Sequence, residues 1–266
     1  MTITLNRLEY YLRLWLLMSR YAFASYLNDR VSFVLFLVGK VVRFILYTAF
    51  IIFLLKSTQT LAGYNLDQTL FFFLTFNLVD TISQFLFRAV YRFRPLVIEG
   101  GLDFVLAKPS SALFRILFGG ADILDLFTIP PLIVITYLVG RTLDPTLLQI
   151  VMYIALLINS LVIATAFHIA VLSLGIITLE IDHTIMIYRD LTNLGRFPID
   201  IYKEPIKSIL TFIVPVGIMM TFPAKVLLGV LSPLGILVSL VVSGLLLFLA
   251  LRFWNYGIKT YTSASS

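Results

Sequence analysis

The sequence predicts an all-α integral membrane protein with six transmembrane helices in a single domain, residues 1–266. Of its 266 residues, 60% are apolar and 13% are charged, against roughly 25% charged residues in soluble domains. Several apolar runs are longer than about 18 residues, the length that indicates a membrane-spanning helix. Once these runs are assigned, no stretch is left for a separate soluble domain.

Residues 1–30 are predicted to form an amphipathic helix in the lipid headgroup layer. Tyr11 and Trp15 lie on one face at helical spacing, while Glu9, Arg13 and Arg20 fall on the opposite face. Aromatic side chains on one side and arginines on the other are typical of interfacial helices. The alternative is an ordinary first turn that leads into a span.

The six predicted spans follow in order along the chain and cover residues 31–55, 66–89, 112–139, 146–178, 206–222 and 233–254. Pro130 and Pro131 are expected to kink or break the third span. Pro215, Gly217 and Pro223 interrupt the fifth. We therefore expect the fifth span to end early and to be followed by a re-entrant or interfacial piece, which must be buried in protein or face water.

A short polar segment between the second and third spans is predicted to form a compact helix, residues 97–110. Its centre reads EGGLDFVLAKPS from Glu99 to Ser110. Asp103 suits the N-terminal end of a helix, whereas Lys108 followed by Pro109 suits the C-terminal end. A capped helix held between two spans is well placed to transmit force from a soluble partner.

The distribution of lysine and arginine predicts the orientation in the membrane. Basic residues are concentrated on one side, which under the six-span assignment carries both termini, the segment 99–110 and the loop 180–205. The other side holds Lys56, Arg141 and Lys225. Because cytoplasmic loops are enriched in basic residues, both termini, the segment 99–110 and the loop 180–205 are predicted to be cytoplasmic. The net charge of +6 is explained by these loops, so nucleic acid is not an expected partner.

Six ionisable residues lie within the predicted spans at similar depths: Lys40, Arg43, Asp80, Asp122, Asp125 and His168. Such groups are costly in a membrane and are candidates for function. A structural layer of ion pairs that fixes helix register is one reading. A wet cavity along a substrate path is a second, and a proton relay is a third.

The chain lacks the residues for several kinds of chemistry. It has no cysteine, which excludes disulfides and thiolate metal sites. No P-loop, G-x-S-x-G or H-E-x-x-H motif occurs. The sequence therefore predicts neither an enzyme nor a cofactor or metal site in this chain, and the energy for transport would come from an ion gradient or from another polypeptide.

Four stretches together resemble the membrane subunit of ABC-2 type ABC transporters, in the branch of six-span bacterial permeases. They are Gly101–Pro109 after the second span, Arg196–Ile199, the pair Thr211–Pro215 with Phe222–Gly229, and the tail from Phe253 to Ser266. Their order and placement along nearly the whole chain support the resemblance.

The resemblance implies a permease that works as a dimer with a second, identical or homologous subunit in the bacterial inner membrane. A separate ABC ATPase subunit would bind ATP and Mg and dock on the cytoplasmic side. Its contacts would include the segment between the second and third spans, with Glu99, Gly101, Leu102, Asp103, Leu106 and Lys108. Export is implied, and the Phe- and Leu-rich spans with a few charges fit an amphipathic or hydrophobic substrate. The alternatives are a secondary transporter or channel that uses the intramembrane charges, and a membrane enzyme that acts on lipid.

Overall fold

A computed structural model describes residues 2–27, 29–179 and 181–262, and over this part the chain is a bundle of helices with one isolated bridge between Leu61 and Tyr64. Met1, Asn28, Glu180 and the last four residues of the tail, which belong to predicted segments, lie outside the described residues. The all-α membrane architecture is confirmed. Five helices are long and apolar enough to cross a membrane, or six if one bent pair is counted.

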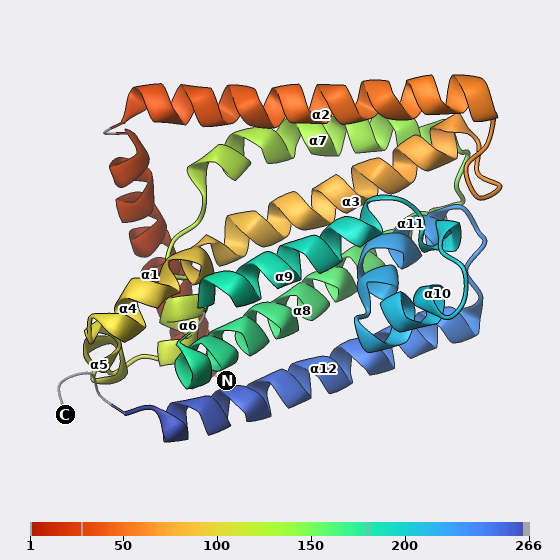
Figure 1. The fold of residues 1–266 in the computed structure, drawn as a ribbon. Helices are drawn as coiled ribbons and strands as arrows, with labels where there is room; N and C mark the ends of the chain where they lie inside the picture. Colours follow the sequence, from red (N-terminus) through yellow and green to blue (C-terminus); the bar gives the residue numbers. More distant parts are fainter. Residues whose placement is uncertain (1, 28, 180, 263–266) are drawn as a thin grey trace.

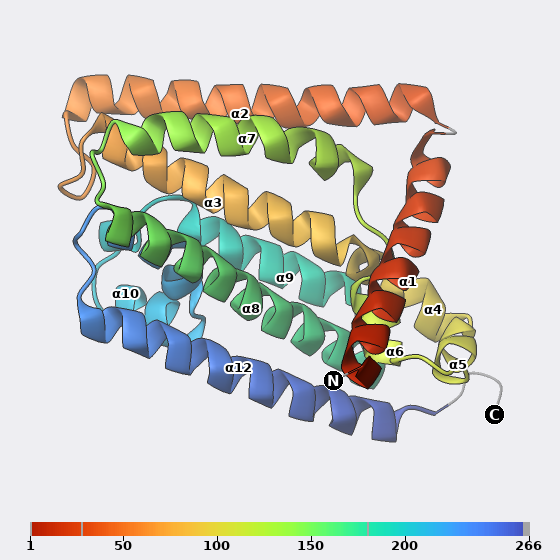
Figure 2. The same cartoon turned by 180° about the vertical axis from the view of Figure 1, so that it is seen from behind.

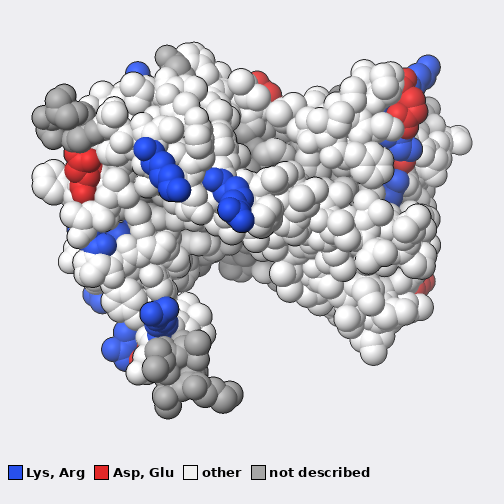
Figure 3. Space-filling view, turned by 90° about the horizontal axis from the view of Figure 1, so that it is seen from below, with Lys and Arg blue, Asp and Glu red and all other residues white. Residues whose placement is uncertain are grey.

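The long helices run between two ends of the molecule (Figures 1 and 2). We call the end that holds both chain termini the termini end, and the other the loop end. The long helices are α2 (Arg30–Thr58), α3 (Leu66–Phe87), α7 (Ile123–Arg141), α8 (Leu147–Thr178) and α12 (Pro233–Thr260). In Figure 3 the charged side chains gather toward the two ends, and much of the middle of that face is uncharged, as expected for a surface in lipid.

Local sequence fixes where several long helices begin. Asn65 and Gln68 form a reciprocal capping box at the start of α3, and Thr146 and Gln149 do the same for α8. Each box satisfies two backbone N–H groups that a helix otherwise leaves without partners. α8 then lies at the centre of the bundle and packs against α12, α3 and α11 (Phe222–Leu227).

The N-terminal helix α1 (Thr2–Leu27) runs across the termini end (Figure 2). Its aromatic face points into the protein, with Tyr11 packed against Phe114 and Trp15 against Phe85. On the opposite face Arg13 forms an exposed ion pair with Glu9. The amphipathic helix predicted for this segment is therefore confirmed, with its two faces as predicted.

The third predicted span, residues 112–139, forms two helices that are separated before the prolines. α6 (Ala112–Leu117) is separate from α7, and the break lies at Gly119–Asp122. α7 runs without interruption through Pro130 and Pro131, so of the predicted kink or break, the break does not occur. Helices in membranes tolerate proline because neighbouring groups satisfy the freed carbonyls, whereas two glycines in sequence favour a break.

The segment between the second and third spans is shorter and more divided than predicted. After η1 (Arg88–Arg92), it contains α4 (Phe93–Ile98) and α5 (Gly101–Leu106) in place of one helix over 97–110. Gly100, with φ of +73°, is the N-cap of α5 and adopts a left-handed conformation that favours glycine. Asp103 lies in the first turn of α5, as the charge argument predicted.

The fifth crossing of the bundle is made by residues 181–201, which were predicted to be a cytoplasmic loop. α9 (Ile181–Asn193) begins at the termini end, where Asp182 Oδ2 lies 3.6 Å from Arg94 Nε. The 3₁₀ turns η2 (Leu194–Arg196) and η3 (Ile199–Ile201) continue to the loop end. There Tyr64, in the connection between α2 and α3, donates a hydrogen bond of 3.1 Å to Asp200. A loop confined to the termini end could not reach Tyr64, so the prediction that residues 180–205 lie on the same side as the termini is wrong.

Residues 206–227, which include the predicted fifth span 206–222, instead form a re-entrant hairpin. It consists of α10 (Ile206–Ser208), the π-helical turns η4 (Ile209–Ile213) and η5 (Gly217–Thr221), and α11, with a bend of 82° between the two halves. Lys207 on the first half and Lys225 on the second both contact Asp200, at 2.8 and 2.7 Å. Because one carboxylate holds the start and the end of the segment, both lie at the loop end.

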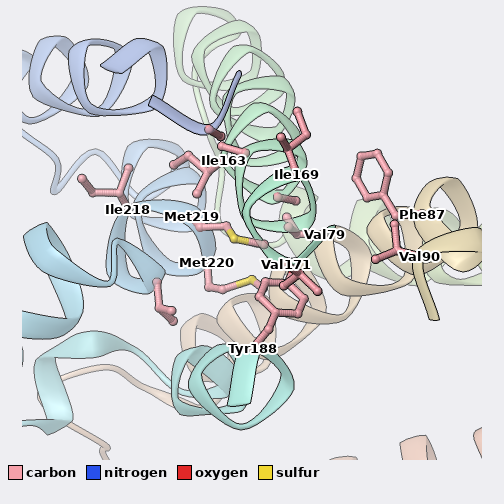
Figure 4. Packing of buried hydrophobic residues seen from close by; sticks show 14 of the residues in the cluster. Val79, Phe87, Val90, Ile163, Ile169, Val171, Tyr188, Ile218, Met219 and Met220 are labelled. Atoms are coloured by element: carbon pink, nitrogen blue, oxygen red, sulfur yellow. The ribbon is translucent and has the colours of Figure 1, made fainter. Parts of the chain in front are cut away.

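The tip of the hairpin is inserted into the core of the bundle. Met219 and Met220 are buried and lie close to Val79 of α3 and Val171 of α8 (Figure 4). Gly195 packs so closely against the hairpin that a Cβ atom there would lie 2.7 Å from Val216 and 2.8 Å from Met220. Hydropathy could not distinguish this buried hairpin from a span, because both are apolar.

We predict that the loop around Lys203 lies on the same side of the membrane as the connection between α2 and α3. The chain has no cysteine, so single-cysteine variants can be labelled without background. With a membrane-impermeant maleimide, Lys203→Cys should label from the same side as Thr58→Cys and from the side opposite to Ser111→Cys. Labelling of Lys203→Cys together with Ser111→Cys would contradict the crossing by residues 181–201.

We predict that Asp200→Asn lowers the free energy of unfolding by about 2 kcal/mol, the order expected for charge-assisted hydrogen bonds. The carboxylate of Asp200 lies 2.8 Å from Lys207 Nζ and 2.7 Å from Lys225 Nζ, and the asparagine amide of the variant cannot replace these charged contacts. Thermal unfolding in detergent at neutral pH should show the loss, whereas the exposed control Asp144→Asn should match wild type.

Candidate functional site

A cavity of about 610 Å³ lies between α2, α3, α7 and the α9–η2 crossing. Each helix contributes polar side chains at i, i+3 or i+7 spacing, which places them on one face. The polar lining residues are Lys40, Arg43, Asn77, Asp80, Thr81, Gln84, Asp125, Thr128, Arg189, Thr192, Asn193 and Arg196. α2, α3 and α7 are otherwise largely apolar, so their polar faces converge on this one space.

The cavity also has extensive aromatic and aliphatic walls. Phe44 and Tyr47 of α2 pack against Phe73 of α3, with ring centroids 5.7 and 6.2 Å apart. Phe76 and Phe127 complete the aromatic lining. A cavity with apolar walls and a few convergent charges is the usual form of a site for a small amphipathic ligand.

Four of the six predicted intramembrane charges line this cavity. Lys40 and Asp125 form an ion pair across it, and the Asp125 side chain is only 1% exposed. Asp80 accepts a hydrogen bond of 2.7 Å from Gln84 and interacts electrostatically with Arg43 and Arg189. The structure therefore brings Lys40, Arg43, Asp80 and Asp125 together, as the polar-layer hypothesis predicted.

Asp122 lies outside the cavity and has a structural contact. Its Oδ1 accepts a hydrogen bond of 2.9 Å from the Leu124 N–H at the start of α7, and its Oδ2 lies 3.3 Å from Arg88 Nε. The side chain thus caps α7 and anchors it to η1. It does not belong to the layer predicted for it.

His168 is also separate from the cavity. It is 2% exposed, and its Nδ1 donates a hydrogen bond of 2.7 Å to the Ala164 carbonyl one turn earlier. The rings of Phe87 and Tyr188 enclose the imidazole at 4.6 and 4.7 Å. This environment is that of a histidine packed in the core. His168 therefore does not lie where a proton relay through the cavity would need it.

Two cavity residues, Arg189 and Arg196, were missed by the sequence analysis because their segment was taken for a loop. The Arg196 guanidinium lies 4.1 Å from the centre of the Tyr47 ring, and its Nη2 donates a hydrogen bond of 2.7 Å to Asn193 Oδ1. The spacing of Arg189, Thr192 and Arg196 repeats that of Asn77, Asp80 and Gln84. This polar i, i+3, i+7 pattern is the signal that could have identified the crossing.

A second surface concerns α5, where the structure separates the predicted contact residues. Leu102 is fully buried in the main core and anchors α5. A buried side chain cannot touch a partner protein, so the contact predicted for Leu102 does not fit the structure. Phe104, which was not among the predicted contacts, is 75% exposed. Glu99, Leu106 and Lys108 are exposed, while Gly101 and Asp103 are partly exposed.

Comparison with known proteins gives a family match over most of the chain. The model of the family described as ABC-2 family transporter protein matches residues 41–265. The match includes nearly all of the cavity lining and the whole re-entrant hairpin. No curated protein and no solved structure matches the chain.

We predict that Lys40→Met destabilises the protein by about 3–5 kcal/mol, because it leaves the buried Asp125 carboxylate without its partner. Thermal unfolding in detergent should show that the double variant Lys40→Met/Asp125→Leu recovers most of this loss, since it removes both charges. If the double variant is no more stable than Lys40→Met, the ion pair is not what holds α2 to α7.

Proposed function

This chain belongs to the ABC-2 transporter family, and we propose that it is the transmembrane subunit of an exporter driven by a separate ABC ATPase, which binds ATP and Mg. The observation that carries the proposal is the charged crossing by α9 beside an open cavity in an otherwise apolar bundle. The subunit would form the translocation path for an amphipathic or hydrophobic substrate.

The exposed charges of α9 support a water-filled path or a subunit interface. Arg189 and Asp190 are exposed on this helix, which lies at the depth of the long apolar helices (Figure 1). Charges at that depth are stable only against protein or water. A dimer with a second permease subunit, identical or homologous, would cover α9 and enclose the cavity.

The basic residues support an orientation in which the termini end is cytoplasmic in a bacterial inner membrane. That end carries the arginines of α1, η1 and α4 together with Lys108, Arg115 and Lys259. The loop end has fewer: Lys56, Arg141, Lys203, Lys207 and Lys225. Correcting the fifth crossing thus weakens the asymmetry without reversing it.

The ATPase would dock on α5. Phe104 offers an exposed aromatic side chain next to the buried anchor Leu102, and aromatic residues of this kind dominate binding energy at protein interfaces. A force on Phe104 would reach the core of the bundle through Leu102. Glu99, Leu106 and Lys108 would form the polar and apolar rim of the contact.

We predict that Phe104→Ala weakens binding of the partner ATPase about tenfold or more and lowers its stimulation by the permease to the same degree. The measurement is co-purification of an ABC ATPase with the permease from its native membrane, followed by an ATPase assay in liposomes. Phe53→Ala is the matched control, because Phe53 is also 75% exposed but lies in the predicted lipid region.

Two outcomes would contradict the proposal. One is an equal loss of ATPase binding in the Phe53→Ala control. The other is transport by the purified chain without any ATPase, which would instead indicate a secondary transporter, and Asp80→Asn should then abolish it.

A further inference from the structure

The charges that line the cavity do not balance. Four cationic side chains, Lys40, Arg43, Arg189 and Arg196, face two carboxylates, Asp80 and Asp125. Because aromatic and aliphatic side chains line the cavity between them, an excess of charge here is worth more than at a fully solvated surface. The cavity therefore favours an anion.

The carboxylates are occupied by specific partners. Lys40 pairs with Asp125, which neutralises one cation and one anion. Asp80 is the remaining carboxylate, and Arg43 and Arg189 both act on it, so at most one of these two arginines is compensated. Both guanidinium groups are exposed to the cavity, with donors available for a further acceptor.

Arg196 adds a cation that is held in a fixed position. It stacks on Tyr47 at 4.1 Å, lies 5.4 Å from the Phe76 ring, and is tethered to Asn193. A planar guanidinium fixed in this way loses little side-chain entropy on binding phosphate or carboxylate. The aromatic rings that hold it also form the apolar wall of the cavity.

We propose that the cavity binds an amphipathic anion, a molecule with a phosphate or carboxylate group and an apolar body. The anionic group is held by Arg43, Arg189 and Arg196, and the apolar body lies against Phe44, Phe73 and Phe127. This inference rests on the proposed function, because it names the substrate class for the same path. Bidentate pairing with guanidinium gives the anionic group a preferred orientation.

A cationic amphiphile fits the same cavity poorly. Its charge would lie closest to Asp80 or Asp125, and both are already engaged by cations of the protein. It would have to displace Lys40 or approach Arg43 and Arg189, which costs like-charge repulsion. The sign of the head group is therefore the property that the cavity selects.

The test is equilibrium binding of radiolabelled dodecyl phosphate to the purified full chain in phosphatidylcholine nanodiscs, with empty discs as background. Wild type should show saturable binding. Arg43→Gln/Arg189→Gln should weaken it at least tenfold, and the charge-conserving Arg43→Lys/Arg189→Lys should retain most of it. Arg252→Gln/Lys259→Gln, which removes two cations of the termini end, should bind like wild type.

Competition experiments test both parts of the ligand. Unlabelled dodecyl phosphate should displace the label, while dodecyl trimethylammonium and inorganic phosphate should not at the same concentration. Displacement by the cation, displacement by inorganic phosphate at equal potency, or unchanged binding in the Gln double variant would each overturn the proposal. Including phosphatidic acid in the disc separates the sources, since displacement assigns the anionic group to a membrane lipid and retention assigns it to a free amphiphile.

The binding assay contains no ATPase and no nucleotide. Failure of the proposed exporter function, seen as transport without an ATPase, would therefore leave this measurement unaffected. Conversely, a lack of arginine-dependent binding would overturn the ligand class and leave the ATPase partnership intact.

Discussion

A charged side chain at bilayer depth needs a partner or water, and this constraint organises the molecule. α2, α3 and α7 are apolar helices that each carry a narrow polar face, and α9 is a crossing with charges on its exposed side. If these polar faces pointed in different directions, each charge would meet lipid at a cost of several kcal/mol. Turning them toward one cavity lets Lys40 pair with Asp125 and gives the arginines a shared space.

The re-entrant hairpin is what allows the short α9 crossing to serve as the fifth crossing. α9 alone has 13 residues and is shorter than the other crossing helices, so beyond Arg196 the chain must be supported at the loop end. The hairpin supplies this support, because its tip packs against Gly195 and its two ends are held by Asp200. Asp200 also reaches Tyr64 in the connection between α2 and α3. The Asp200 carboxylate thus links three parts of the chain: the α2–α3 connection, the crossing by residues 181–201 and the re-entrant hairpin.

Much of the fold could be predicted from the sequence, because hydropathy and helix caps are local properties. The amphipathic α1 and the long helices α2, α3, α8 and α12 were predicted close to their observed positions. Hydropathy failed at residues 180–222, since it assigned the charged α9 to a loop and residues 206–222 of the apolar hairpin to a span, while the re-entrant piece was expected only after that span. Both errors have one cause: burial in protein permits polar helices and apolar hairpins at membrane depth, and it depends on contacts distant in sequence. The same limit applies to the six intramembrane charges. Similar depth in the sequence grouped the four that line the cavity, but it could not show that Asp122 and His168 have structural contacts elsewhere.

The position of α4 suggests how movement at α5 would reach the cavity. Arg94 of α4 lies near Asp182 at the start of α9, but both side chains are at least half exposed, and such a pair contributes at most about 1 kcal/mol. The stronger connection is packing, because Phe93, Val97 and Leu102 belong to the same buried cluster as Tyr188 of α9. Tyr188 directly precedes Arg189, whose side chain lines the cavity. A shift of α5 relative to the bundle would therefore act on the arginines of the cavity through close-packed side chains, which transmit displacement because they cannot be compressed.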